Sequence, residues 1–323
     1  MNRLCRGIFY ILVVMTAPAS MAQAQKYPAK TIRLILPFPP GGAVDALARI
    51  MGPQLSEALG QQVVMENRAG AAGNIGAEIV AKSPPDGYTV LMGAIPLSIS
   101  VTVYSKLGYD LLRDLAPVSL LASTPNIVVV HPSVPAKSLK ELIALAKARP
   151  GQLDFASSGS GGSPHLAGAL FNNLAGTTMN HIPYKGGGPA VIALVAGECS
   201  VGFATAPSVI HHLQSGRLRG LAVTSAQRAP LVPDLPTVSE AGVPGYEAGA
   251  WQGLLVPTGT RREIISRLQA ESSKVLKLPE VKERMDATGL TPIGSTPEDF
   301  GAFLRSEIEK WGKVVRSVGM RIE

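Results

Sequence analysis

The chain has 323 residues, of which 46% are hydrophobic and 5% aromatic, and its formal net charge is +7. The basic residues are spread along the chain without a Lys/Arg cluster, so the composition argues against a nucleic-acid partner. About three hundred residues exceed what one hydrophobic core usually organises, which predicts two lobes.

The first residues are typical of an export signal. Arg3 and Arg6 precede an uncharged apolar run at 8–15, and a stretch of small residues ends at Ala24. We predict a signal peptide at residues 1–24, cleaved near Ala24, and a periplasmic mature chain. This cleavage removes two arginines and no acidic residue, which lowers the net charge to about +5. No later stretch is long and apolar enough to cross a membrane.

The first hundred mature residues alternate short apolar strands with helical patterns. Apolar residues recur at helical spacing after Val44, and Gly60 stands where a C-terminal cap belongs. This alternation predicts an α/β fold. The expected strands are 31–36, 63–66 and 88–92, and the expected helices are 44–59 and 74–81.

The same alternation restarts at Asn126. Ser138 and Glu141 form a capping box that opens the first helix of this section. The expected strands are 127–130, 153–156, 179–183, 200–204 and 218–224, and the later helices are 165–174 and 189–195.

A proline-rich connector, 230–244, leads to a strand at 251–256 and to two helices. Their start signals are Thr260 with Glu263 and Thr296 with Asp299. Because the middle section is complete in itself, the first and last sections are expected to form one lobe. The predicted division is 25–126 plus 228–323 for lobe 1 and 127–227 for lobe 2.

The turn after the first strand has the chemistry of an anion site. Gly41 and Gly42 let a ligand oxygen approach the backbone, and the following helix presents free N–H groups and the positive end of its dipole. Asp45, in the first helical turn, can hold the loop by accepting its N–H bonds. The alternative is a tight turn followed by an ordinary N-terminal acid.

A second glycine-rich loop spans Ser157–Ser163 and adds four serine hydroxyls to the same backbone donors. The alternative is a flexible surface turn. If the two loops face each other across a cleft between the lobes, each can hold one end of a dianion or zwitterion.

The sequence has few features that would indicate an enzyme. An exported hydrolase using the Ser157–Ser163 loop and His165 is the alternative function, but the G-x-S-x-G elbow is missing. A histidine at a helix start is more often a cap or a loop anchor than a base. Dinucleotide and P-loop motifs are also missing, so we expect no enzyme and no cofactor. His211 and His212 are helix neighbours that diverge, so we expect no metal site.

Three further residues have open roles. Lys185, beside Tyr184 and before three glycines, either adds positive charge to the cleft or is a surface lysine. Trp251 either lines a pocket or fills the core. Cys199 is the single mature cysteine, so it forms no intramolecular disulfide, and it is expected to be a small buried hydrophobe.

Four ordered blocks together resemble one family, the Bug receptors, which are the solute-binding proteins of tripartite tricarboxylate transporters. The blocks are PFPPGGAVD at 37–45, ENRAGAAGNIGAEIVAKSPPDGYTVLMG at 66–93, HLAGALF at 165–171 and HIPYKGGGPA at 181–190. The resemblance extends over essentially the whole chain.

This resemblance implies a two-lobed type II periplasmic-binding-protein fold that closes on a small carboxylate. The partners it implies are that ligand and either the membrane subunits of a transporter or a sensor, and we expect a monomer. The family's binding loops fall on Phe38, Pro40, Gly41, Gly42, Ala43 and Asp45, on Ser157, Gly159, Gly161 and His165, and on Tyr184, Lys185, Gly186, Gly187 and Gly188.

The sequence departs from the family pattern at three positions. Gly162 stands where a serine or threonine is usual, which removes a hydroxyl. Ser200 and Ala204 stand where relatives often have acids, which removes a contact to an amino group. We therefore include Ala204 among the site residues and expect a ligand without an amine, such as a dicarboxylic or aromatic acid.

Overall fold

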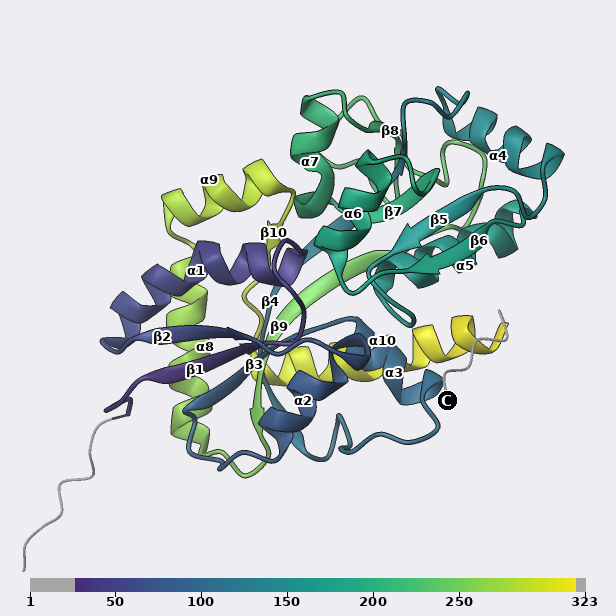
Figure 1. Ribbon diagram of the computed structural model, residues 1–323. Helices are drawn as coiled ribbons and strands as arrows, with labels where there is room; N and C mark the ends of the chain where they lie inside the picture. Colours follow the sequence, from purple (N-terminus) through teal and green to yellow (C-terminus); the bar gives the residue numbers. More distant parts are fainter. Residues whose placement is uncertain (1–26, 318–323) are drawn as a thin grey trace, which may run out of the picture.

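The computed structural model describes residues 27–317, so the predicted signal peptide lies outside the described residues. The chain has an α/β fold with two lobes that are joined by long strands (Figure 1). The strand order is β2-β1-β3-β9-β4-β7-β5-β6, and β8 and β10 pair with β4 outside this path.

The first lobe is built on three parallel strands, to which three further strands are added by antiparallel pairing. Its strands β1 and β3 are almost fully buried, which explains why they read as continuous apolar runs. The strands are β1 (Ile32–Leu36), β2 (Val63–Asn67), β3 (Thr89–Ala94), β9 (Gly249–Pro257), the first part of β4 (Leu115–Val130) and β10 (Thr291–Pro292). The helical segments are α1 (Ala43–Leu59), η1 (Ala71–Gly73), α2 (Asn74–Ala81), α3 (Pro96–Val103), α8 (Arg262–Leu276), α9 (Pro279–Thr288) and α10 (Pro297–Ser317).

The second lobe repeats the alternation of strand and helix that the sequence predicts. Its parallel strands pair in the order β7-β5-β6, and β7 and β8 both pair with β4. The strands are β5 (Asp154–Ser157), β6 (Asn180–Pro183), β7 (Val201–Thr205) and β8 (Arg219–Val223), and the helices are α4 (Leu139–Ala148), α5 (Ser163–Ala175), α6 (Gly187–Val195) and α7 (Ala206–Gln214).

Strand β4 connects the lobes. Its residues 115–125 pair with β9, and its residues 126–130 pair with β7 and β8. The sequence predicts only 127–130 as a strand here, which is too short. Pro117 and Pro125 interrupt the apolar pattern, but Pro117 lies at a register shift, where a proline does not break the ladder.

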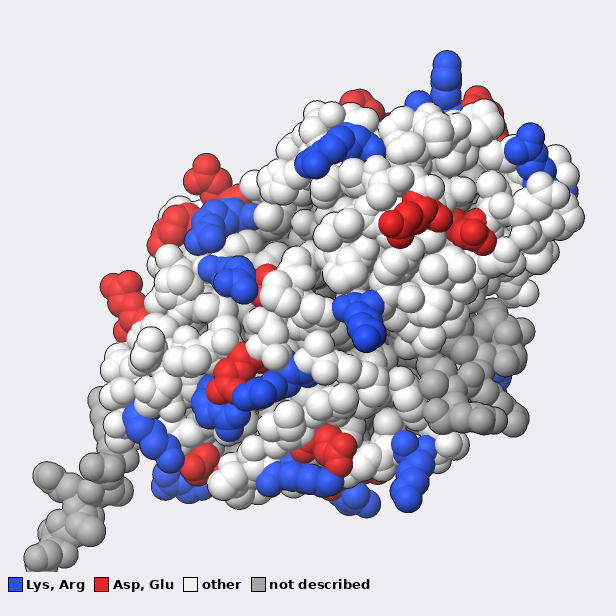
Figure 2. All heavy atoms as spheres, viewed as in Figure 1, with Lys and Arg blue, Asp and Glu red and all other residues white. Residues whose placement is uncertain are grey.

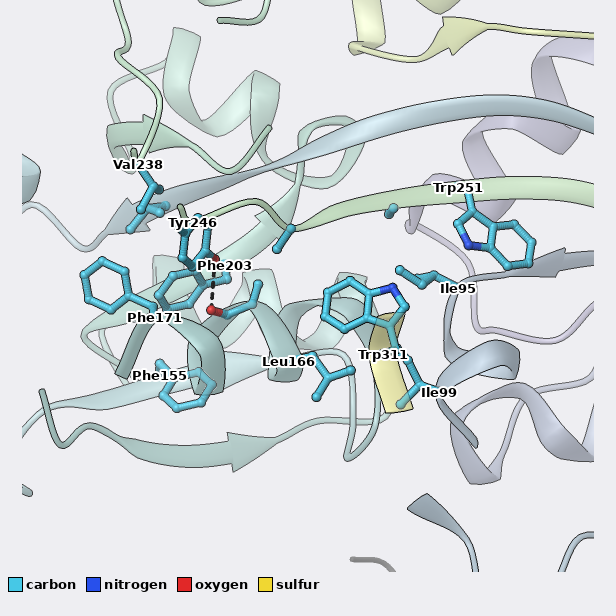
Figure 3. Close-up of a cluster of buried hydrophobic side chains, with 14 of the residues drawn as sticks. Ile95, Ile99, Phe155, Leu166, Phe171, Phe203, Val238, Tyr246, Trp251 and Trp311 are labelled. Carbon is cyan, nitrogen blue, oxygen red and sulfur yellow. Dashed lines mark hydrogen bonds between the residues drawn. The ribbon is translucent and has the colours of Figure 1, made fainter. Parts of the chain in front are cut away.

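The hydrophobic core continues from one lobe into the other. Figure 3 shows one group of aromatic side chains around Phe155, Phe171 and Phe203 of the second lobe and a second group, Trp251 and Trp311, in the first lobe, with Leu166 between them. Tyr246 Oη donates a hydrogen bond of 2.9 Å to the Ala167 carbonyl. Trp251 is buried and packs edge-on against Phe300, so the core interpretation of this residue is correct.

Two of the three predicted capping boxes form. Ser138 Oγ accepts from Glu141 N at 3.2 Å, and Thr296 Oγ1 accepts from Asp299 N at 3.1 Å. The Thr260 prediction is wrong, because its hydroxyl donates to the Pro257 carbonyl at 2.7 Å and so closes the preceding turn instead of capping α8. The structure has three helices after β9, where the sequence predicts two. The additional helix is α9.

Candidate ligand-binding site

A pocket of about 660 Å³, including space that opens to solvent, lies between the two lobes. None of its lining residues carries a charge. The lining residues are Phe38, Gly42, Ala43, Val44, Ala94, Ile95, Pro96, Ala156, Ser157, Ser158, Ser163, Pro164, Gly187, Ala190, Leu194, Ala204, Thr205, Ser208, Ala250 and Gln252.

Five helices begin at this pocket. The first-turn or N-cap residues of α1, α3, α5, α6 and α7 are all part of its lining. None of these five N-termini has a side-chain cap hydrogen bond, whereas α4, which does not line the pocket, is capped by Ser138. Uncapped N-termini present free N–H groups and partial positive charge. The pocket is therefore positive without containing a cation.

The first glycine loop is held by Asp45, as the sequence predicts. Asp45 Oδ2 accepts from Gly41 N at 3.2 Å, and Arg49 forms two further hydrogen bonds with the same carboxylate. Burial, the largest single effect, raises the pKa of Asp45, but the hydrogen bonds from Arg49 and Gly41 together lower it below its ordinary value. Asp45 thus supports the loop from behind and does not line the pocket.

The second glycine loop is held by two stacked histidines. His165 Nδ1 accepts from Gly161 N at 3.0 Å, and His181 Nε2 lies 2.6 Å from Ser157 Oγ. The two rings are 3.6 Å apart and nearly parallel. Burial lowers the pKa of His181 to about 4, and burial together with the neighbouring His181 lowers the pKa of His165 to about 3. Both rings are therefore neutral at pH 7, and His165 acts as the loop anchor that the sequence indicates.

The first glycine loop contacts both helix α7 and the third loop, the glycine-rich segment at 184–188, across the cleft. Ser208 Oγ donates to the Gly41 carbonyl at 3.2 Å. A Cβ atom at Gly188 would lie 3.0 Å from the Pro40 carbonyl oxygen, and one at Gly186 would clash with Pro39 at 2.4 Å. Glycine at these positions lets the two backbones approach, so the structure represents a closed arrangement of the lobes.

The predicted site residues divide into two groups. Those that line the pocket are Phe38, Gly42, Ala43, Ser157, Gly187 and Ala204. Those that lie outside its lining are Pro40, Gly41, Asp45, Gly159, Gly161, His165, Tyr184, Lys185, Gly186 and Gly188.

Two of the outer residues have other surroundings. Lys185 is exposed, and the Tyr184 hydroxyl lies 3.5 Å from the Sγ atom of Cys199, which is itself buried. The polar end of Tyr184 thus contacts Cys199, behind the third loop.

Sequence reasoning missed the pocket residues of α3 and α7 and the side chain of Gln252. The α3 segment alternates apolar residues with Ser98, Ser100 and Thr102, and it contains no glycine-rich turn or charged residue that would signal a site. Gln252 did give a signal, because it is a polar residue in an apolar strand, and it is only 1% exposed.

The surface around the site carries no strong charge. Figure 2 shows acidic and basic side chains interspersed on the visible face, with a largely uncharged middle. Within residues 27–317, no helix is long and apolar enough to span a membrane. The same part of the chain contains no group of three or more His, Cys, Asp or Glu side chains placed to hold a metal ion.

The fold and the pocket define a two-lobed solute-binding protein, and comparison with known proteins gives its family. The sequence profile of the tripartite tricarboxylate transporter family receptors (TctC) matches residues 47–320. The chain therefore belongs to this family. It is 40% identical to Protein BugT of Bordetella pertussis over 319 residues, which covers 98% of this chain and 97% of BugT.

Two solved structures extend the comparison. Rpa4515 of R. palustris, solved with adipate, has a TM-score of 0.89 and 36% identity, with 91% of this chain and 99% of that chain covered. MatC (Rpa3494) of Rhodopseudomonas palustris, solved with bound malate, has a TM-score of 0.85 and 31% identity, with 90% and 100% covered.

Proposed function

We propose that this chain is a periplasmic receptor that captures a small carboxylate between its two lobes and delivers it to the membrane subunits of a tripartite transporter. The observation that carries the proposal is the convergence of five uncapped helix N-termini on one pocket. Such an arrangement attracts an anion and gives a cation no partner. The adipate and malate held by the two relatives are small carboxylates, which supports the same class of ligand.

The proposed ligand contacts are the backbone N–H donors of the glycine loops. Gly42, Ala43 and Gly187 supply N–H groups at the starts of α1 and α6. Two of the other predicted residues support these loops: Asp45 and His165 hold the first and second loops through backbone N–H groups. This division assigns binding to the lining residues and loop geometry to the outer ones.

The proposed lobes are residues 25–126 with 228–323, and residues 127–227. The change of pairing partners along β4, from β9 to β7 and β8, falls at Pro125 and Asn126, which supports the first boundary. We further propose that the mature receptor begins at residue 25, after a signal peptide, and acts as a monomer.

Catalysis is not part of the proposed function. The Ser157–His181 pair has the spacing of a nucleophile and its base, but within residues 27–317 no carboxylate hydrogen-bonds either ring. A histidine base is normally oriented by such a group. The Ser157 hydroxyl is also engaged with the backbone of Gly159, which favours a structural role.

A thermal-shift panel of mono-, di- and tricarboxylates, each beside its uncharged amide, tests the proposal. A ligand at a hundredfold excess over its Kd adds about 2.7 kcal/mol of stability, so a binding acid raises the melting temperature measurably. The amides should have no effect. If no acid raised the melting temperature and esters were hydrolysed until His181→Ala stopped the reaction, the receptor proposal would be wrong.

A further inference from the structure

The pocket contains one buried polar side chain without a partner in the protein, that of Gln252. Gln252 lies on β9 between β3 and β4, in register with Ala94 and Ala122. Residues 250 and 252 share one face of the strand and both line the pocket, whereas Trp251 between them points into the core. Gln252 Oε1 is buried and accepts no hydrogen bond.

The other polar side chains of the pocket that are buried, Ser157 and Ser163, have partners within the protein, and so does the half-buried Ser208. Ser157 and Ser208 donate to the carbonyls of Gly159 and Gly41. Ser163 Oγ accepts from Asn126 Nδ2 at 2.9 Å. Because buried acceptors in folded proteins are almost always partnered, the isolated oxygen of Gln252 marks the place of a donor that the ligand brings.

The charge of the pocket decides which donor this is. An ammonium group could donate to Gln252, but five positive helix ends surround it and the lining contains no acid to pair with it. A second carboxylate can accept from Gln252 Nε2, but it offers only acceptors to Oε1 and so leaves that buried oxygen without a donor. A hydroxyl group is neutral and can donate a hydrogen bond. It therefore suits both the acceptor Oε1 and the positive potential of the helix N-termini.

We propose that Gln252 is a specificity-determining residue that accepts a hydrogen bond from a hydroxyl group of the ligand, so that the pocket selects amine-free hydroxy acids. The inference rests on the proposed function. Most of the lining is apolar, with Phe38, Val44, Ile95 and Leu194 offering hydrocarbon surface, so the carbon skeleton between carboxylate and hydroxyl is accommodated without further polar contacts.

Two matched series of acids test this inference by isothermal titration calorimetry. The first series is pentanoate, its 2-, 3-, 4- and 5-hydroxy derivatives, glutarate, 2-aminopentanoate and 5-aminopentanoate. The second is benzoate and its three hydroxy derivatives. We expect one hydroxy acid to bind at least about tenfold more tightly than its parent, and the amino derivatives to bind more weakly than the parent.

Variants connect the preference to the side chain. Gln252→Leu should reduce the advantage of the hydroxy acid to less than about twofold, because the acceptor is removed while the volume is kept. Gln252→Met is a second apolar variant, used if the first fails to fold. Gln214→Leu, at the exposed end of α7, is the matched control and should keep the full advantage.

The outcomes separate the two proposals. Three results would each overturn the role of Gln252. The first is equal affinity for the hydroxy acids and their parent acids, and the second is tighter binding of glutarate or an amino acid than of every hydroxy acid. The third is an affinity advantage of the hydroxy acid that persists in Gln252→Leu. Each of those results would leave carboxylate binding in place. If none of the acids in these series or in the thermal-shift panel bound, the proposed function itself would fail.

Discussion

The side chain of Ser208 donates a hydrogen bond of 3.2 Å to the carbonyl of Gly41, although the two residues are 167 positions apart in the sequence. Ser208 belongs to the first turn of α7 in the second lobe, and Gly41 belongs to the first glycine loop of the other lobe. This bond exists only while the lobes are closed, so its energy contributes to closure and not to the stability of either lobe.

We therefore expect Ser208→Ala to weaken acid binding by up to about tenfold, since one hydrogen bond contributes about 1 kcal/mol. Titration calorimetry measures the change. The melting temperature without ligand should hardly change. Ser215→Ala is the matched control, because that hydroxyl, at the C-terminal end of α7, bonds the carbonyl of His211 within the same lobe. Equal losses in both variants would mean that the Ser208 contact has no special role.

Gly42→Val should abolish binding while the fold is kept. Gly42 has an extended backbone (φ −98°), which any residue can adopt, and a Cβ atom there meets nothing within 4 Å. Because Gly42 lines the pocket, the valine side chain occupies space that the carboxylate needs, and we expect affinity to fall at least about a hundredfold. Circular dichroism and titration together measure this, with Gly42→Ala expected to be intermediate. Unchanged affinity would show that the first loop is only a turn.

Acid should destabilise the protein through His165 and His181. Their pKa values in the folded chain are about 3 and about 4, below the ordinary 6.5, so between these values and 6.5 the unfolded chain binds more protons. Their contribution to stability is complete above pH 6.5 and is lost as the pH falls towards 4 and then 3. Both rings retain some solvent exposure, so we expect a loss on the order of 1 kcal/mol between pH 7 and pH 5.

Urea unfolding at a series of pH values checks this loss. His165→Gln should flatten the dependence, because one of the two groups is removed. The exposed His211 on α7 provides the control, and His211→Gln should keep the slope of the unmodified protein. A stability that stayed constant from pH 7 to pH 5 would contradict the assignment.

Glu307 should be essential for the core where α10 meets the sheet. Its Oε2 atom accepts hydrogen bonds from both indole nitrogens, Trp251 Nε1 at 3.1 Å and Trp311 Nε1 at 2.9 Å. Glu307→Leu leaves two buried donors without an acceptor, so we expect the free energy of unfolding to fall by about 2–4 kcal/mol.

Glu307→Gln keeps an oxygen acceptor in the same position, so its loss should be under about 1.5 kcal/mol. Denaturant titration measures both variants. A leucine variant as stable as the unmodified protein would mean that the two indole groups find other partners.

Local sequence signals predicted much of the fold. The alternation of apolar runs and helical patterns placed most strands and helices of both lobes to within a few residues. The sequence identifies Asp45 as the acceptor for the first loop because that bond joins residues four apart, which a helix N-terminus brings together whatever the rest of the chain does. The local pattern underestimates the length of strand β4, because its prolines interrupt that pattern and only its pairing with β9 reveals the full strand.

The sequence by itself determined the family, the glycine-rich loops and the apolar segments, since these depend on ordered motifs and on spacing along the chain. Only the tertiary structure decided that five helix N-termini meet at one uncharged pocket and that Gln252 faces it alone. It also decided that His165 stacks on His181 and that Ser208 closes onto Gly41. These features depend on which distant residues the folded sheet brings into contact, and no local pattern encodes that choice.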